Sequence, residues 1–231
     1  MAQRQRGIDT REAILSAMAD LVLDKPYAFI QKSEILAHAS VTNGGLYAHF
    51  TSKEDIATQL MEVEFNLALR DVTERVADLL PSIELLIAAV FESSRYLLAR
   101  PRLHAAIVLH AEVGRTLPDP TKDTQRWHGF LTDLVDKASA IGDIKPGLDS
   151  ARLATYILGA WAGTRMVSDI TSGQDDLFGR IEDLMHFVIA AAVTPDRVEY
   201  FDTYLTRYAN RFRTVGNVDP ESTVTGHQAS A

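Results

Sequence analysis

The chain has 231 residues, of which 46% are hydrophobic, and its formal net charge is −8 at pH 7. This length supports a sizeable core divided over one or two domains. Because the chain has no cysteine, disulfides, thiolate metal sites and cysteine nucleophiles are excluded.

The charge is unevenly distributed along the chain. Residues 1–53 sum to +1, and the remaining residues sum to −9. A slightly basic head on an acidic body suits a protein that approaches a polyanion with one end, although an ordinary acidic protein is compatible with the same totals. No signal peptide follows the basic N-terminus and no apolar run has transmembrane length, so we expect a cytoplasmic protein.

The sequence predicts an all-α fold, because apolar residues recur at helical spacing and no alternating strand pattern is present. Asp9 or Thr10 is the expected N-cap of the first helix, and Thr42 is that of the short third helix. Ser52 begins a capping box with Asp55 for the long fourth helix. The expected helices cover approximately residues 10–23, 35–39, 43–50, 53–80, 81–100, 101–113, 122–141, 150–170, 177–193 and 195–212.

Residues 31–53 contain a short helix, a three-residue turn and a second short helix, which is the helix-turn-helix arrangement. The second helix of such a unit lies in the major groove of DNA. Leu46 and Phe50 supply apolar groups that lock this helix against the first two. Gly44 and Gly45 permit close backbone approach to DNA, at about 1 kcal/mol of helix stability each relative to Ala.

Four polar residues of this segment are spaced to reach DNA phosphates from one surface: Thr42, Tyr47, His49 and Lys53. The second short helix carries no Lys or Arg. We therefore expect the salt sensitivity of DNA binding to come mainly from other cations, namely Arg4, Arg6, Arg11 and Lys53.

Motifs of catalysis are absent from the sequence, which contains no P-loop, GxGxxG, GxSxG or HExxH pattern. His104 and His110 are six residues apart and lie on different helix faces, so we expect no metal site from them. We predict no enzyme activity, no catalytic residue and no cofactor. An all-helical enzyme whose site assembles from distant residues stays open.

Three stretches of the head closely resemble the TetR family of repressors: Thr10–Ile14, Val41–Phe50 and Ser52–Asp55. The resemblance covers about the first 55 residues. It implies a homodimer of nine or ten helices that binds palindromic operators and leaves DNA when a small molecule enters the C-terminal domain. It also implies that Thr42, Tyr47, His49 and Lys53 are phosphate contacts, with a base methyl as the alternative for Tyr47.

The head departs from the family pattern at several positions. This chain has Asn43 where relatives usually have Lys, Gly45 where they have Ala, Ile30-Gln31 where they have Thr-Thr, and Pro26 where they have Gly. Loss of the Thr pair removes an expected cap from the second helix and leaves Ser33 as its nearest hydroxyl. Asn pairs bidentately with adenine, whereas Lys pairs with guanine acceptors. We therefore hypothesise that Asn43 shifts one base preference per half-site from G toward A, with weaker, less specific binding as the rival.

The body resembles the γ-butyrolactone receptors of actinomycetes in three further stretches: Arg126–His128, Gly142–Ile144 and Gly163–Ser168. We expect Trp127 to line a ligand pocket, because an indole offers a flat apolar wall and one N–H donor. Thr164 and Ser168 lie one helical turn apart and are expected to supply hydroxyls. Glu64 stands where several lactone receptors carry Gln, and an ionised carboxylate cannot donate a hydrogen bond.

Each ligand residue also has a structural alternative. Trp127 is compatible with a core position, Thr164 and Ser168 with hydrogen bonds to the preceding helical turn, and Glu64 with simple exposure to solvent. The effector alternatives are a γ-butyrolactone-type signal or, for a pseudo-receptor, an antibiotic or other small molecule. An activator, or a helical small-molecule-binding protein that has lost DNA binding, also stays open.

The predicted domains are a DNA-binding head over residues 1–53 and a ligand-binding and dimerising body over residues 54–213. Residues 214–231 are polar without a periodic apolar face, so we expect a disordered tail. Two helices of the body are apolar around much of their circumference and are expected to build a four-helix dimer interface, with internal burial of both apolar stripes in a monomer as the alternative. The apolar residues of these helices are Leu153, Tyr156, Ile157, Ala160, Trp161, Ile181, Leu184, Met185, Val188 and Ile189.

Overall fold

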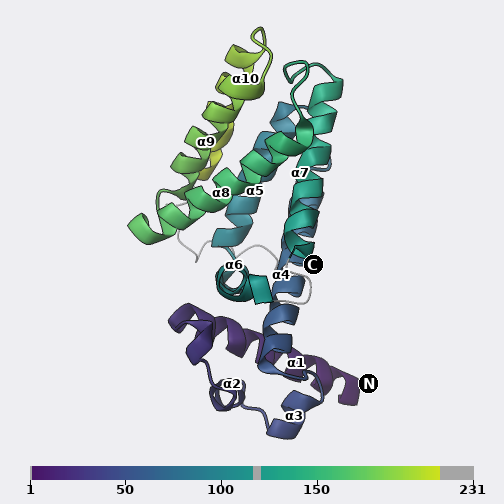
Figure 1. The fold of residues 1–231 in the computed structure, drawn as a ribbon, viewed down its shortest axis with the longest axis vertical. Coiled ribbons are helices and arrows are strands. Elements are labelled where there is room, and N and C mark those ends of the chain that lie inside the picture. Colours follow the sequence, from purple (N-terminus) through teal and green to yellow (C-terminus); the bar gives the residue numbers. More distant parts are fainter. Residues whose placement is uncertain (1, 117–120, 214–231) are drawn as a thin grey trace, which may run out of the picture. The chain divides into compact units, whose positions relative to one another are not determined.

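The structure is a computed structural model that describes residues 2–116 and 121–213 (Figure 1). These residues form ten α-helices and two short 3₁₀ helices, so the all-α prediction is confirmed. In chain order the elements are α1 Ala2–Asp24, η1 Tyr27–Phe29, α2 Lys32–His38, α3 Asn43–Tyr47, α4 Lys53–Val76, α5 Ile83–Leu98, α6 Pro101–Val113, η2 Gly114–Thr116, α7 Lys122–Ala140, α8 Ser150–Ser172, α9 Leu177–Ala192 and α10 Val198–Arg213. The predicted tail, residues 214–231, lies outside the described residues.

Three predicted helix boundaries were wrong. Helix α1 begins at Ala2, so neither Asp9 nor Thr10 caps it; the preceding residues are mostly Ala, Gln and Arg, which favour continuation of the helix. Helix α3 ends at Tyr47 rather than near Phe50, because the N–H of His49 turns back to the carbonyl of Leu46 at 3.0 Å. Helix α4 ends at Val76 rather than at the predicted residue 80.

The chain divides into two compact units. The first unit contains Met1–Asp78 and Glu92–Gly129, and the second contains Leu79–Phe91 and Phe130–Ala231. Helices α1 to α4 and α6 belong to the first unit, whereas α8, α9 and α10 belong to the second. Packing therefore groups the three N-terminal helices with α4 and α6, while the functional division after residue 53 stays a prediction.

The first unit has one continuous apolar core. Leu46 and Phe50 are buried in it, at 0% and 1% exposure, which confirms their predicted role in fixing α3. Residues from α1, α2, α4 and α6 complete this core: Ile14, Leu15, Met18, Ile35, Ile56, Leu60, Met61, Ala105, Ala106 and Leu109. Burying side chains of this size contributes about 1.5–3 kcal/mol each, so α3 is held by packing despite its two glycines.

The second unit is organised by an aromatic cluster and by one buried acid. The rings of Phe91, Phe178 and Phe212 lie 4.9–6.2 Å apart between centroids. Asp143 is fully buried; its carboxylate accepts the backbone N–H of Ile83 at 3.1 Å and pairs with the guanidinium of Arg197 at 3.1 Å. Asp143 thereby fixes the starts of α5 and α10.

The described ranges contain neither a membrane-spanning helix nor a group of metal ligands. None of their helices is both long and apolar enough to span a bilayer. Within residues 2–116 and 121–213, no three His, Asp or Glu side chains are grouped so that they could hold a metal ion.

Candidate functional site

Helix α3 begins with a side-chain cap that leaves its first residues exposed. The hydroxyl of Thr42 accepts the N–H of Gly45 at 3.1 Å, which confirms the predicted cap. Asn43 and Gly44 follow and are both exposed. The N-terminal end of α3 therefore presents an amide side chain and bare backbone to solvent.

The two glycines of α3 are not required by the packing of the protein itself. A Cβ built on Gly44 would meet no atom within 4 Å, and one on Gly45 would lie 3.5 Å from Oγ1 of Thr42, an ordinary contact. Neither glycine has a positive φ angle. Their presence is thus consistent with the predicted close approach of backbone to DNA.

Helix α2 has a cap that the sequence analysis missed. The carboxylate of Glu34 accepts the backbone N–H of Gln31 at 2.8 Å and also pairs with Lys25. The hydrogen bond from Lys25, followed by that from the Gln31 backbone, lowers the pKa of Glu34. Glu34 therefore caps the start of α2 in the absence of the Thr pair. Ser33 is exposed on the first turn of this helix.

Tyr47 and Lys32 form an exposed pair that joins α3 to α2. Nζ of Lys32 donates to the phenol oxygen of Tyr47 at 2.8 Å and lies 4.8 Å from the centroid of its ring. Tyr47 is 52% exposed. The sequence analysis did not select Lys32, because this cation is 15 residues away from Tyr47 along the chain.

Lys53, predicted as a phosphate contact, makes its contacts within the protein. Its Nζ donates to the carbonyls of Tyr27 and Ile30, each at 3.1 Å, and lies 4.1 Å from the centroid of the Tyr27 ring. Ser52 caps α4 as predicted, with its hydroxyl accepting the N–H of Asp55 at 3.1 Å. The Asp55 carboxylate departs from the expected box, since it accepts the N–H of Thr51 at 2.8 Å.

His49 is half-buried beside α1. A Cβ on Gly7 would lie 3.7 Å from Cε1 of His49, an ordinary van der Waals contact. The centroid of the His49 ring is 6.5 Å from that of Phe50. One part of the imidazole thus packs on the protein, and its predicted contact with DNA stays a prediction.

Arg11 is also engaged within the first unit. Its guanidinium pairs with Glu12 at 3.2 Å and donates to Oε1 of Gln59 at 2.8 Å. Gln59 in turn donates to Asp55 at 2.8 Å. A DNA phosphate would therefore have to compete with Glu12 and Gln59 for the Arg11 guanidinium. The predicted contribution of Arg11 to salt sensitivity depends on that exchange.

Glu64 lies in the interior of the first unit, so its predicted alternative of solvent exposure was wrong. It is 3% exposed, and its Oε1 lies 2.8 Å from Nε of Arg102 on α6. Arg102 also donates to Glu12 of α1 at 2.9 Å. Burial raises the pKa of Glu64 and Arg102 opposes this shift. Arg102 was missed by sequence reasoning, because nothing local to Glu64 indicates its partner.

Ser168 is buried and uses its hydroxyl within the second unit. It donates to Oδ1 of Asp176 at 2.6 Å, rather than to the preceding turn of α8. Ser172 donates to the same oxygen at 2.7 Å. A ligand at Ser168 would therefore meet an acceptor, since the hydroxyl hydrogen is engaged. Trp127 and Thr164 are half-buried, and their predicted ligand contacts stay predictions.

Arg165 is a buried cation that the sequence analysis passed over. It is 8% exposed on α8, and its Nε has no hydrogen-bond partner among the described residues. Burial lowers the pKa of its guanidinium, against the opposing charge of Asp169. The Nε–H of Arg165 is thus a buried donor without an acceptor in the described residues, and such an unsatisfied donor costs folding free energy.

Helices α8 and α9 each divide their apolar residues between core and surface. Most of the residues selected from the sequence for dimerisation are buried within the chain: Leu153, Ile157, Ile181, Leu184, Met185, Val188 and Ile189. Tyr156 is exposed, and Ala160 and Trp161 are half-buried. Further large apolar residues of these two helices are exposed: Met166, Val167, Ile170 and Phe187.

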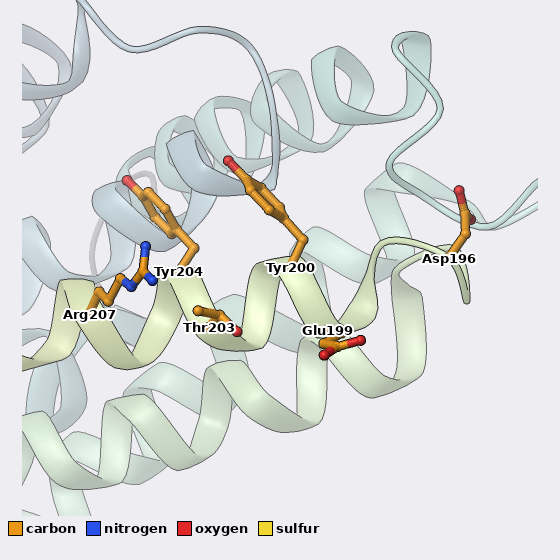
Figure 2. A pocket seen from close by; sticks show the side chains of 6 residues that line it. All are labelled: Asp196, Glu199, Tyr200, Thr203, Tyr204 and Arg207. Carbon is orange, nitrogen blue, oxygen red and sulfur yellow. The ribbon is translucent and has the colours of Figure 1, made fainter.

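A groove of about 480 Å³ follows one side of α10 between Asp196 and Arg207. Figure 2 shows the rings of Tyr200 and Tyr204 pointing to the same side of this helix. The hydroxyl of Tyr200 donates to Glu84. The groove is lined by acids, hydroxyls and one arginine, so its charge selects no class of ligand and we assign it no function.

Comparison with known proteins relates this geometry to a family of regulators. The model described as bacterial regulatory proteins of the tetR family matches residues 14–60, which include α2, α3 and the start of α4. The A-factor receptor protein of Streptomyces griseus is 26% identical over 196 residues, covering 84% of this chain and 68% of that protein.

Solved structures with the same fold extend the similarity to the body. A γ-butyrolactone receptor (ArpA-like protein) is 26% identical with a TM-score of 0.72, covering 89% of this chain and 99% of that chain. CprB from Streptomyces coelicolor, solved with its biological operator sequence, is 27% identical with a TM-score of 0.71 and covers 89% and 99%. TylP, a TetR regulator from Streptomyces fradiae, is 27% identical with a TM-score of 0.66 and covers 90% and 93%.

Proposed function

We propose that the chain, which matches the tetR family model over residues 14–60 and is similar to γ-butyrolactone receptors, is a DNA-binding regulator rather than an enzyme. It acts as a homodimeric repressor that a small molecule releases from a palindromic operator. One observation carries the DNA side of this proposal. On α3, Leu46 is fully buried, whereas Asn43 and Tyr47 are exposed. A short helix anchored by one face, with a polar face free, is what a major-groove reader requires.

The proposed DNA-contacting residues lie on or beside α2 and α3: Ser33, Thr42, Asn43, Gly44, Tyr47 and His49. The backbone N–H groups at the start of α4, at Lys53, are proposed to face a phosphate as well. Asn43 is the proposed base reader, since its exposed amide can pair bidentately with adenine. The hydroxyls are proposed to position the protein on phosphates.

The proposed dimer uses the exposed apolar residues of α8 and α9. Met166, Ile170 and Phe187 are 53%, 76% and 70% exposed. Exposed apolar side chains gathered on two adjacent helices favour an interface with a second copy. A two-fold dimer would carry two α3 helices to half-sites about 34–36 Å apart, or a multiple of that distance.

The effector is proposed to be a small molecule with an apolar part and a polar ring, of the γ-butyrolactone type. Relatives described as receptors for A-factor and γ-butyrolactone support this class. In the first unit, Trp127 would supply an apolar wall, and Glu64 would first have to leave Arg102. In the second unit, Thr164 is a separate candidate that would supply a hydroxyl. An antibiotic or another small molecule is the alternative effector.

The test begins with selection of duplexes from random DNA by the purified chain. We expect enrichment of a palindrome and its retention in a gel-shift assay. Addition of a panel of γ-butyrolactones should then release the palindrome. Absence of any enriched sequence would contradict the operator proposal, and undiminished binding with every lactone would contradict the effector class.

A further inference from the structure

The positive charge available to α3 must come from other parts of the chain. Helix α3 contains only Asn, Gly, Leu and Tyr. Between Gly7 and Lys53 there are four lysines and arginines: Arg11, Lys25, Lys32 and Lys53. DNA affinity at physiological salt depends on such cations, because each one that neutralises a phosphate releases a counterion.

Three of these four cations already have strong acceptors within the first unit. Arg11 pairs with Glu12, and Lys25 pairs with Glu34. Lys53 donates to two backbone carbonyls and covers the ring of Tyr27. Transfer of Lys53 to a phosphate would leave both carbonyls without this donor, so the gain on DNA would be offset within the protein.

Lys32 differs from the other three. It is exposed at the first position of α2, and its partner in the described structure is the neutral phenol of Tyr47. A lysine ammonium has three N–H donors. The hydrogen bond to Tyr47 uses one donor, so two are left for phosphate oxygens.

We infer that Lys32 on α2, rather than Lys53, is the phosphate-binding cation beside α3, and that it acts as one unit with Tyr47. The 2.8 Å between Nζ of Lys32 and Oη of Tyr47 brings both groups within reach of a single phosphate. The phenol oxygen accepts from Lys32, so its own hydrogen is free to donate to DNA. A charged donor also polarises the phenol and strengthens that second hydrogen bond.

Lys53 then has a positioning role. Its ammonium joins the start of α4 to the carbonyls of Tyr27 and Ile30, which lie just before α2. This contact fixes the spacing between α4 and the helix-turn-helix. These contacts use two of its three N–H donors, so Lys53 has fewer donors left for a phosphate than Lys32 has.

The inference rests on the proposed DNA-binding surface and is tested by the salt dependence of binding. Affinity for the selected palindrome, and for a scrambled duplex of equal length, is measured by fluorescence anisotropy over a range of KCl concentrations. We expect Lys32→Met to reduce the slope of log affinity against log salt by about 1.8, because the proposed dimer loses two phosphate-binding cations, and to weaken both duplexes alike. Lys32→Arg should keep the wild-type slope, because it keeps the charge.

Two further variants separate the roles of the two lysines. Lys53→Met should keep the slope within about 0.3 of wild type but lower the unfolding temperature by about 3 °C, since a structural contact is lost. Lys137→Met is the matched control: Lys137 is on α7 in the second unit, paired with Asp133 at 2.7 Å. Lys137→Met changes the net charge by the same amount. Its slope of log affinity against log salt and its unfolding temperature should both match those of the wild type.

The outcomes are distinguishable from failure of the DNA-binding proposal itself. If the wild-type chain binds neither duplex at low salt, the proposed function fails. If the wild type binds and Lys32→Met has the slope of Lys137→Met, the inference about Lys32 is overturned. A loss of about two units of slope in Lys53→Met alone would overturn it as well, since the dimer carries two copies of this lysine.

Discussion

Glu64 of α4 and Arg102 of α6 form an ion pair in the interior of the first unit, with Oε1 and Nε 2.8 Å apart. Arg102 extends the contact to Glu12 of α1 at 2.9 Å. The Arg102 guanidinium therefore connects three helices of the first unit, α1, α4 and α6. A ligand group that displaced Glu64 from this arginine would change the contacts of α1 as well as those of α4.

Removal of Arg102 should destabilise the protein in a pH-dependent way. Arg102→Met leaves the buried Glu64 carboxylate without its partner, and we expect a loss of about 3 kcal/mol of unfolding free energy at pH 7.5. Burial raises the pKa of Glu64, so the folded variant binds a proton more tightly than the unfolded chain does. The loss should therefore become smaller as the pH falls toward 5. Urea unfolding at both pH values measures it, and equal losses would contradict the prediction.

The double variant Glu64→Gln/Arg102→Met provides the control for this pair. It removes the charge together with its partner, so it should be more stable at pH 7.5 than Arg102→Met alone. Additive losses from the two single variants would show that the pair is not coupled.

Asp176 should contribute stability that is lost in acid. Hydrogen bonds from Ser168 and Ser172, with Arg180, lower its pKa from 3.8 to about 2. A carboxylate with a lowered folded-state pKa stabilises the protein above its unfolded pKa and loses that contribution as the pH falls through the folded value. The difference in unfolding temperature between wild type and Asp176→Asn should thus shrink between pH 3.8 and about 2. A constant difference in unfolding temperature over this pH interval would contradict the stabilising role of the Asp176 carboxylate.

Gly44→Ala should separate stability from DNA affinity. A Cβ at this position meets no atom of the protein, and Ala favours a helix by about 0.8–1 kcal/mol over Gly. We expect higher unfolding free energy together with weaker operator binding, because the methyl group would meet DNA. Gly129→Ala, also in a helix with open space around it, is the matched control and should gain stability with unchanged affinity. Unimpaired binding by Gly44→Ala would remove the argument for close backbone approach.

Asn43→Lys should change which base is preferred at one position of each half-site. Asn recognises adenine through two hydrogen bonds, whereas Lys recognises the acceptors of guanine. Selection from random duplexes by wild type and variant should therefore return palindromes that differ from A to G at that position. Identical palindromes would refute the hypothesis, and a uniform gain in affinity for every duplex would favour the rival of weak, less specific binding.

Phe187→Glu should prevent dimerisation and, with it, operator binding. Phe187 is 70% exposed on α9, and a charge buried in an apolar interface is strongly unfavourable. Sedimentation velocity should give a dimer for wild type and a monomer for the variant. Leu80→Glu is the control, since Leu80 is 79% exposed but lies outside α8 and α9. A dimeric Phe187→Glu would exclude this surface.

The sequence by itself determined the helices and the short-range contacts at their ends. Helical spacing predicted the burial of Leu46 and Phe50, and the caps Thr42 and Ser52 were confirmed because a cap joins residues three positions apart. The first boundary of α1 was missed, because its N-terminal turns contain no apolar periodicity to mark them.

Only the tertiary structure decided which charged side chains have partners within the protein and which partners these are. Lys53 and Lys32 are indistinguishable as lysines in the sequence, yet one covers Tyr27 and the other contacts Tyr47. Glu64 acquired a partner on another helix that no local pattern indicates. Packing also divided the apolar residues of α8 and α9 between core and surface. The physical reason is common to these cases: the energy of a charge or an apolar group depends on its neighbours in space, and folding brings those neighbours from distant parts of the chain.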